Sequence, residues 1–209
     1  MEYIFADELG LDTTFAKKDY ADYWLADTYK VFCDGKLIAV ASKGNQPFNF
    51  LSDDMYYGDR DGSYEWYKNV RYNENTNNPQ NNGLLDIWGF CYEGIRKASI
   101  YIKYIDKNRE MTSSEISDTK AQARFLRGYF YWHLLRVYGP VPLLPDEGMD
   151  YTKSYDDLSI PRSTYQECAE YIASEMALAA KDLPLSRGAN EIVKPTKGAA
   201  LSIRARAYL

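Results

Sequence analysis

The sequence predicts an all-α protein built from stacked helical hairpins, with long irregular connectors between some of the helices. Three observations predict this class. Apolar residues recur at spacings of three and four in five segments, capping and stop signals bound several of them, and alanine and glycine are frequent where helices would cross. At 209 residues the chain has room for one large domain or two small ones, and we expect a single helical domain over residues 1–209.

The first two expected helices follow from apolar periodicity. The earlier one covers about residues 18–32, with a ladder of Tyr20, Trp24, Thr28 and Val31. The later one follows Asn81-Asn82-Gly83 and reaches about Asp106, with a ladder of Leu84, Trp88, Tyr92, Ile95, Ser99, Ile102 and Ile105. Because side chains three and four positions apart share one face of a helix, each ladder predicts one buried face.

The third helix has the strongest signal. It is expected to begin at a cap on Ser113 or Ser114 and to end at Tyr138, where Gly139-Pro140 cannot continue it. Its later half, residues 125–135, is apolar on almost every side. A helix of this kind is expected to lie buried among its neighbours.

Two more helices follow. One opens with the capping pattern Ser163-Thr164-Tyr165-Gln166 and ends near Leu183-Pro184, and the other begins at Pro195-Thr196 and continues through Tyr208. No strict repeat of about 34 residues is visible, so periodicity alone does not predict a regular tetratricopeptide array. Long connectors are expected over about residues 35–82 and 139–162.

Composition argues against several classes of function. A net charge of -5 disfavours binding to a nucleic-acid backbone, and no apolar run is long enough for a transmembrane helix. His133 is the single histidine, and Cys33, Cys91 and Cys168 form no C-x-x-C pair, so neither a metal site nor a cofactor is predicted. We expect buried thiols and a core histidine.

The first connector carries the unusual chemistry. Between residues 53 and 72 its aromatic residues are Tyr56, Tyr57, Tyr64, Trp66, Tyr67 and Tyr72. Its polar residues are Asp53, Asp54, Asp59, Arg60, Asp61, Glu65, Asn69 and Arg71. Flat rings with polar tips, beside groups that form fixed hydrogen bonds, suit a sugar ring with one C–H face and a rim of hydroxyls. The alternative is a tyrosine-rich loop packed over the helical core.

Signals for catalysis or metal binding are weak. Asp59-Arg60-Asp61-Gly62 is similar to part of a calcium loop, but Val70 stands where that loop needs a glutamate, so a turn is the better interpretation. Asp156 and Asp157 are adjacent and would point apart, which is unsuited to a glycosidase pair. No catalytic residue is predicted. Arg124 and Arg127 are expected to pair with carboxylates while their stems pack.

One motif resembles a known family. Residues 121–143, AQARFLRGYFYWHLLRVYGPVPL, closely resemble the signature A-E-A-R-F-L-R-A-x-x-Y-F-x-L-x-R-x-Y-G-x-V-P-L of the SusD/RagB family. Other segments resemble the family's motifs in the same order. They are Trp88-x3-Tyr92-x2-Ile95-x2-Ala98, with Ser99 where an asparagine is usual, Pro161-Arg162-Ser163-Thr164, and residues 194–209. The resemblance spans roughly residues 16–209.

The resemblance implies a surface lipoprotein of the outer membrane that captures an oligosaccharide or other nutrient. Such proteins deliver the ligand to a SusC-like TonB-dependent transporter without catalysis, and their helical part has tetratricopeptide-like pairs. This chain would be the N-terminal portion of a longer protein. Two departures matter: no cysteine precedes Cys33 to carry a lipid, and much of the family's ligand site would lie beyond Leu209. Met1 to Asp7 also lack the regions of a signal peptide.

The resemblance also favours ligand contact by the first connector. The expected ligand-binding residues are Trp66 as the stacking platform, Tyr56, Tyr57 and Tyr64 as further rings, and Asp54, Arg60 and Arg71 as polar partners. Two other functions stay open. One is a tetratricopeptide-like scaffold that binds another protein, and the other is an all-α glycosidase.

Overall fold

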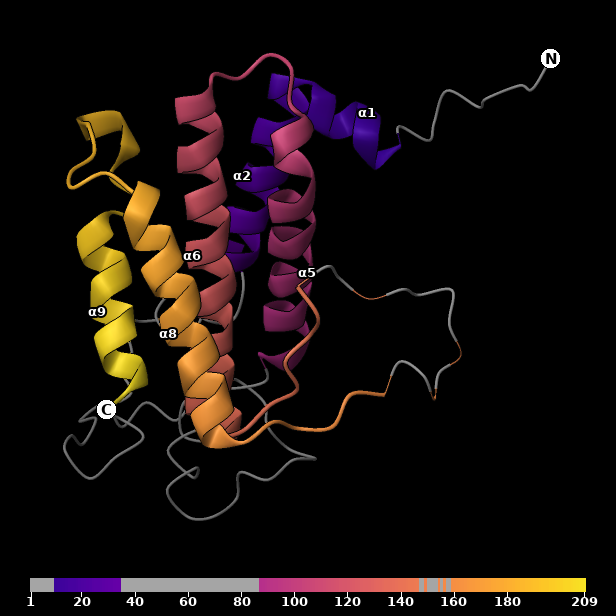
Figure 1. Ribbon diagram of the computed structural model, residues 1–209, viewed down its shortest axis with the longest axis vertical. Coiled ribbons are helices and arrows are strands. Elements are labelled where there is room, and N and C mark those ends of the chain that lie inside the picture. Colours follow the sequence, from indigo (N-terminus) through magenta and orange to yellow (C-terminus); the bar gives the residue numbers. More distant parts are fainter. Residues whose placement is uncertain (1–9, 35–86, 147–148, 150–153, 155, 157–158) are drawn as a thin grey trace, which may run out of the picture. The chain divides into compact units, whose positions relative to one another are not determined.

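The computed structural model describes residues 10–34, 87–146, 149, 154, 156 and 159–209 (Figure 1). Every regular element in these ranges is helical. The elements are α1 (Leu11–Ala16), α2 (Lys18–Asp34), α5 (Trp88–Tyr104), the 3-10 turn η4 (Ile105–Lys107), α6 (Ser113–Tyr138), α8 (Tyr165–Asp182), the 3-10 turn η5 (Ala189–Glu191) and α9 (Lys197–Ala207). The all-α class predicted from the sequence is confirmed.

Residue contacts divide the chain into two units. Met1–Val31 and Cys91–Leu209 form one, and Phe32–Phe90 forms the other. The helices α1 to α9 named above lie in the first unit, apart from the last residues of α2 and the first residues of α5. We call this first unit the helical unit.

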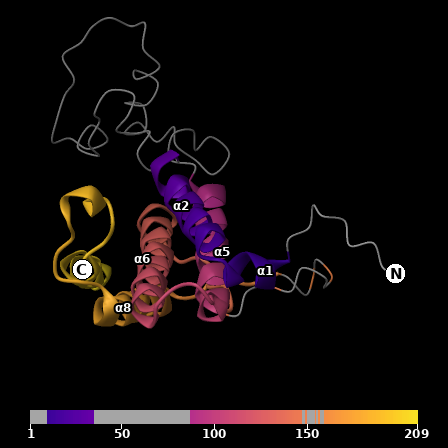
Figure 2. The ribbon, with the colours of Figure 1, turned by 90° about the horizontal axis from the view of Figure 1, so that it is seen from above.

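Helices α5, α6, α8 and α9 run in alternating directions within the helical unit (Figure 1). Seen from above, α6 lies between α2 and α5 on one side and α8 and α9 on the other (Figure 2). Helix α8 packs against both α6 and α9. Neighbouring helices therefore form antiparallel pairs, as the predicted hairpins require, while the closer likeness to tetratricopeptide repeats stays a prediction.

The helix ends are set by local signals. Thr112 caps α6: its Oγ1 accepts from the Glu115 backbone N–H at 3.2 Å, and the Glu115 carboxylate accepts from the Thr112 N–H at 2.8 Å. The expectation of a cap on Ser113 or Ser114 was therefore wrong by one or two residues, because the Thr-x-x-Glu spacing satisfies two free N–H groups at once. Helix α6 ends at Gly139, whose φ of 68° is in the left-handed region.

Helices α8 and α9 also begin at threonine caps. Thr164 forms a capping box with Glu167, so the predicted box of Ser163 with Gln166 was wrong by one residue. The Thr196 hydroxyl accepts from the Ala199 N–H at 3.3 Å. The short helix α1 was not predicted from the sequence. Its Phe15 is fully buried and contacts the rings of Trp24, Tyr101 and Tyr104, so α1 is held by packing rather than by its own length.

Glycines permit close approach to α6 on two sides. A Cβ atom built on Gly94 of α5 would lie 2.4 Å from the Phe130 ring, and one on Gly128 would lie 2.9 Å from Met176 Cε of α8. Real Cβ atoms do not come so close to a buried ring, so a larger residue would push the helices apart. The alanine and glycine content expected at helix crossings is confirmed here.

We expect Gly94→Ala to lower the free energy of unfolding by about 2 kcal/mol, because Phe130 is buried and cannot move aside freely. Gly198→Ala in α9 is the matched control: its new Cβ meets nothing closer than 3.8 Å. That substitution should be neutral or slightly stabilising. Urea unfolding of both variants measures the difference, and equal stability of the two would contradict the packing argument.

Candidate functional site

A buried charge cluster joins α6 to α8. The side chains of Arg127 and Glu175 are only 2% and 3% exposed. Arg127 Nε donates to Glu175 Oε2 at 2.9 Å, and Arg124 Nη1 donates to Glu175 Oε1 at 2.9 Å. One carboxylate therefore pairs with two guanidinium groups, which confirms the expected pairing of both arginines with carboxylates.

The cluster reaches two further parts of the helical unit. Arg127 Nη1 lies 3.3 Å from Ser99 Oγ of α5 and 3.2 Å from Asp146 Oδ1. The Tyr171 hydroxyl of α8 donates to the same Asp146 oxygen at 2.7 Å. Burial opposes the charge on Arg127, yet Glu175, Tyr171 and Asp146 together raise its pKa above the ordinary value.

The segment 139–146, which follows α6, is tied to the helices at several points. The Tyr131 hydroxyl accepts from the Leu144 N–H at 2.9 Å, and the Tyr92 hydroxyl donates to the Pro142 carbonyl at 2.8 Å. Arg162 donates to the carbonyls of Tyr138 and Pro140 at 3.2 and 2.7 Å. The start of α5, the end of α6 and the start of α8 are therefore fixed together at one end of the helical unit.

The saturated hydrogen bonding of the cluster indicates a structural role. Each Glu175 oxygen already accepts from a guanidinium group, so this carboxylate is poorly placed to take a proton from a ligand. Tyr131 is similarly held, and burial raises the pKa of its hydroxyl to about 12. The cluster holds helices in register and anchors segment 139–146.

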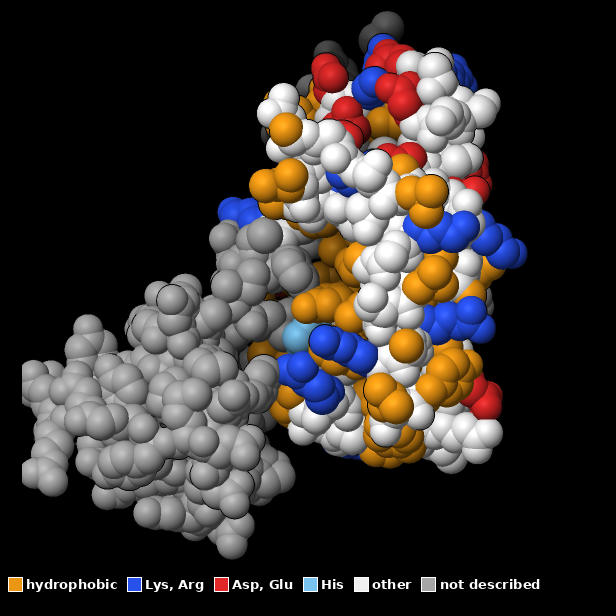
Figure 3. Space-filling model, turned by 90° about the vertical axis from the view of Figure 1, so that its left-hand side faces the viewer, with side chains coloured by type: hydrophobic (Ala, Val, Ile, Leu, Met, Phe, Trp, Pro, Cys, Tyr) orange, Lys and Arg blue, Asp and Glu red, His pale blue; other side chains and the backbone are white. Residues whose placement is uncertain are grey.

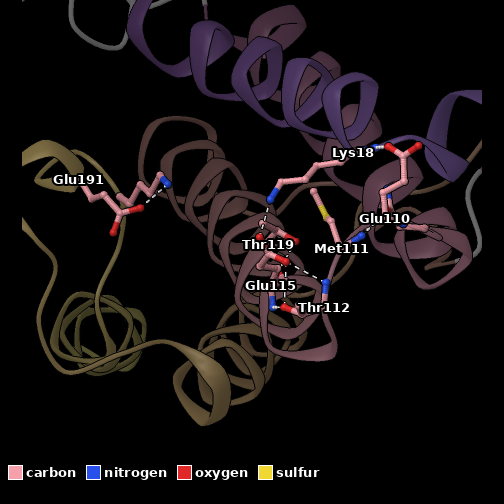
Figure 4. Close-up of polar contacts among 9 residues, drawn as sticks. Lys18, Glu110, Met111, Thr112, Glu115, Thr119 and Glu191 are labelled. Carbon is pink, nitrogen blue, oxygen red and sulfur yellow. Dashed lines mark hydrogen bonds and ion pairs between the residues drawn. The ribbon is translucent and has the colours of Figure 1, made fainter.

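A second polar group lies at the opposite end, where α2 and α6 begin (Figure 4). Glu110 accepts from the Lys18 backbone N–H at 2.9 Å, and Lys18 Nζ lies 2.5 Å from Glu115 Oε1. The Lys18 hydrogen bond, together with those from Thr112, lowers the pKa of Glu115 to about 2. Because the surface pair with Lys18 and the helix cap at Thr112 account for this shift, it does not mark a catalytic acid.

His133 lies in an aromatic cluster of α6. Its ring centroid is 4.4 Å from that of Tyr129 and 4.8 Å from that of Trp132, and its side chain is 7% exposed. The expected core position is confirmed, but Nε2 has no hydrogen-bond partner among the described residues, so this histidine is not fully satisfied. Burial, with a smaller effect of Arg136, lowers its pKa to about 3, so the ring stays neutral at physiological pH.

A pocket of about 380 Å³ lies where α6 ends, α8 begins and α9 ends. Its lining residues are Trp132, Leu135, Arg136, Tyr165, Arg206, Ala207 and Leu209. This pocket was not predicted from the sequence. The sequence signal for this pocket is the pair Trp132 and Arg136, which lie four positions apart on one helical face.

The ligand-binding residues expected from the sequence lie outside the described residues. They are Asp54, Tyr56, Tyr57, Arg60, Tyr64, Trp66 and Arg71. Asp59 and Asp61 of the calcium-like segment lie there too, so both expectations stay predictions.

The described residues also bear on metals, thiols and membranes. They contain no group of three or more His, Cys, Asp or Glu side chains that could hold a metal ion. Cys91 and Cys168 are buried free thiols, and burial raises the pKa of Cys91 to about 12, which keeps it unreactive. No described helix has the length and apolar character needed to cross a membrane.

Comparison with known proteins gives one consistent result. A family model described as "Starch-binding associating with outer membrane", named SusD-like, matches residues 24–209. A SusD-like protein of Bacteroides ovatus is 27% identical over 128 residues, which is 60% of this chain and 22% of that protein.

Solved structures agree. A SusD-like protein from Bacteroides fragilis matches with a TM-score of 0.71 and 24% identity, over 96% of this chain and 36% of that one. A laminarin-binding SusD-like protein matches with a TM-score of 0.73 and 19% identity, over 92% and 40%. At these identities the two structures establish a shared fold, and the chain spans about two fifths or less of each.

Breaking the buried cluster should be costly. We expect Glu175→Gln to lower the free energy of unfolding by about 3 kcal/mol or more, because it leaves two guanidinium groups without their buried counter-charge. Asp12→Asn is the control, since Asp12 pairs with Lys107 at the surface and should contribute less than about 1 kcal/mol. Chemical unfolding compares the two, and similar losses would contradict a central role for the buried pair.

The single histidine should make stability depend on pH. The unfolded imidazole gains a proton below about pH 6.5, whereas the folded one does not until about pH 3. Stability is therefore present above pH 6.5 and is lost as the pH falls, by about 2 kcal/mol between about pH 7.5 and about pH 5. His133→Gln should remove this slope, as measured by urea unfolding across that range. An unchanged slope in the variant would exclude His133 as its source.

Proposed function

The chain belongs to the SusD-like family described as starch-binding and associated with the outer membrane, and from this membership we propose that it binds an oligosaccharide at the cell surface. The bound glycan would be delivered to a SusC-like TonB-dependent transporter without chemical change. The observation that carries the proposal is the family match over residues 24–209, which includes the whole aromatic connector. The laminarin-binding relative has the same fold and supports a carbohydrate as the ligand.

The proposed ligand contacts lie in the first connector. Trp66 would stack on the C–H face of a sugar, with Tyr56, Tyr57 and Tyr64 as further rings, and Asp54, Arg60 and Arg71 would hydrogen-bond its hydroxyls. The described part of the chain resumes at Ile87, just before α5, and the Tyr92 hydroxyl of α5 donates to the Pro142 carbonyl.

A binding role fits the chemistry of the helical unit. Glu175, the most buried carboxylate among the described residues, is held by two arginines, and the histidine stays neutral and enclosed. These arrangements support a rigid framework rather than acid–base turnover.

The chain's place in a larger protein is also part of the proposal. Residues 1–209 would form the N-terminal helical domain of a SusD-like lipoprotein. The support is that it covers 22% of the Bacteroides ovatus relative and 36% of the Bacteroides fragilis one.

A second candidate function is a helical scaffold that binds another protein. One observation favours it: three aliphatic residues of the connector between α8 and α9, Leu185, Ile192 and Val193, are exposed by 80% or more. Arg187 pairs with Asp118 of α6 through two short bonds of 2.8 and 2.7 Å, so this connector is held in place. A scaffold of this kind predicts no affinity for sugars.

We expect Trp66→Ala to weaken binding to a soluble glycan by about tenfold or more, because stacking on an indole face supplies much of the contact area. The experiment screens the 209-residue chain against laminarin, starch and other soluble polysaccharides by isothermal titration calorimetry, then compares the variant with the original on the best ligand. Tyr23→Ala, which removes an exposed ring on α2, is the control and should bind normally. Normal binding by Trp66→Ala would show that the connector is scaffold, and the absence of any sugar affinity would favour the protein-binding alternative.

A further inference from the structure

One contact of the buried charge cluster differs from the others. The Glu175 side chain is 3% exposed and accepts from a guanidinium group on each of its oxygens. The Asp146 side chain, which also pairs with Arg127, is 63% exposed. It lies at the end of segment 139–146, outside the helices. Arg127 therefore has one counter-ion inside the fold and a second one at its surface.

Without Asp146 the cluster would carry an excess positive charge. Arg124 and Arg127 bring two positive charges to Glu175, which supplies one negative charge. Water can solvate the Arg124 side chain, which is 25% exposed, but it has little access to Arg127, which is 2% exposed. The second negative charge comes from Asp146, whose Oδ1 lies 3.2 Å from Arg127 Nη1.

Two hydrogen-bond donors meet at that oxygen. The Tyr171 hydroxyl donates to Asp146 Oδ1 at 2.7 Å, beside the contact from Arg127. Burial raises the pKa of Tyr171, so its hydroxyl keeps its proton and stays a donor at neutral pH. The Tyr131 ring packs edge to face against Tyr171, with the centroids 5.2 Å apart, and holds this donor in position. An N–H and an O–H that converge on one point suit a carboxylate oxygen.

The burial of Arg127 strengthens its attraction for an anion. The lysine and arginine side chains visible on the surface in Figure 3 face water, which screens their charge and weakens their hold on any one anion. The charge on Arg127 is enclosed by protein and is screened far less. A carboxylate that contacts Arg127 and Tyr171 is therefore bound more strongly than one at a surface lysine.

Asp146 is not the residue that holds its own segment to the helices. The Leu144 N–H donates to the Tyr131 hydroxyl at 2.9 Å, and the Val141 carbonyl accepts from the Ser163 N–H at 3.1 Å. Both bonds precede Asp146 in the chain, so they can persist when its carboxylate moves away. The contact of Asp146 can therefore be exchanged without unfolding the helical unit.

We propose that Arg127 and Tyr171 form a binding site for the carboxylate of a small acidic ligand, and that Asp146 fills this site as an internal, displaceable ligand. The acidic ligand competes with Asp146, and its binding frees the end of segment 139–146. The inference goes beyond the proposed function, because it rests on the charge cluster alone and does not require that the chain bind neutral glycans.

Removal of the internal carboxylate should open the site to an added one. In Asp146→Ala, saturating acetate should raise the thermal unfolding midpoint by about 3 °C or more, because it binds the folded chain. Acetamide has nearly the same shape without the charge and should raise the midpoint by less than about 1 °C. Sodium chloride keeps the ionic strength equal in all samples, so general screening cancels. The variant should fold, because Arg127 keeps its pair with Glu175 at 2.8 Å.

Asp106→Ala is the matched control. Asp106 is 60% exposed, much like Asp146, but its partner Lys120 is 27% exposed and can be solvated by water after the change. Acetate should therefore have no specific effect on this variant. A double variant, Asp146→Ala with Tyr171→Phe, lacks the second donor and should bind acetate about tenfold more weakly than Asp146→Ala alone.

Displacement of Asp146 is tested in the original 209-residue chain by two-dimensional NMR of the nitrogen-labelled protein. Acetate should shift the Asp146 backbone amide signal along a saturable curve, at least about tenfold more weakly than it binds Asp146→Ala, because the internal carboxylate competes. Three results would overturn the proposal. They are equal effects of acetate on Asp146→Ala and Asp106→Ala, equal effects of acetate and acetamide, and an Asp146 signal that stays unchanged while the variant binds acetate.

Discussion

The buried ion pair between Arg127 and Glu175 is the interaction on which the arrangement of the helical unit depends. A guanidinium group that is 2% exposed must have its hydrogen bonds satisfied by the protein, because water cannot reach it. Its partners come from α5, from α8 and from segment 139–146. These hydrogen bonds can all form together only when α5, α8 and segment 139–146 take one arrangement around Arg127. The pair therefore favours this packing of the helices around α6, in which Gly94 and Gly128 also permit the close approach of α5 and α8.

Much of this fold could be predicted from the sequence, because helix ends and faces are local properties. The periodicity of α2, the Gly139 stop of α6 and the presence of a capping box at the start of α8 depend on residues within one or two turns of each other. The cap of α6 was misplaced because Ser113 and Ser114 are also good capping residues, and only the reciprocal bond to Glu115 distinguishes Thr112. The helix α1 was missed because its single buried residue, Phe15, has partners far along the chain.

The site was less accessible to prediction. The sequence indicated that Arg127 needs a carboxylate but could not identify Glu175, which is 48 residues away in the chain. Convergence of Arg136 and Arg206 on Trp132 is similarly a property of helix packing, since spacing along one helix does not determine what a second helix brings to it. The aromatic connector differs from these pairings, because its composition alone predicts contact with a ligand. Its residues lie outside the described part of the chain, so this role stays a prediction.

The anchoring of segment 139–146 has a consequence for how such a framework can change over evolution. The second connector, residues 139–162, is held to the helices near both of its ends. The Tyr131 hydroxyl accepts from the Leu144 N–H, and Arg162 donates to the Pro140 carbonyl. Insertions or deletions between Leu144 and Arg162 need not disturb the helices, because each doubling of a flexible loop costs only about 0.6 kcal/mol of closure entropy. One scaffold can thus carry connectors of different length and composition while the helical core keeps its packing.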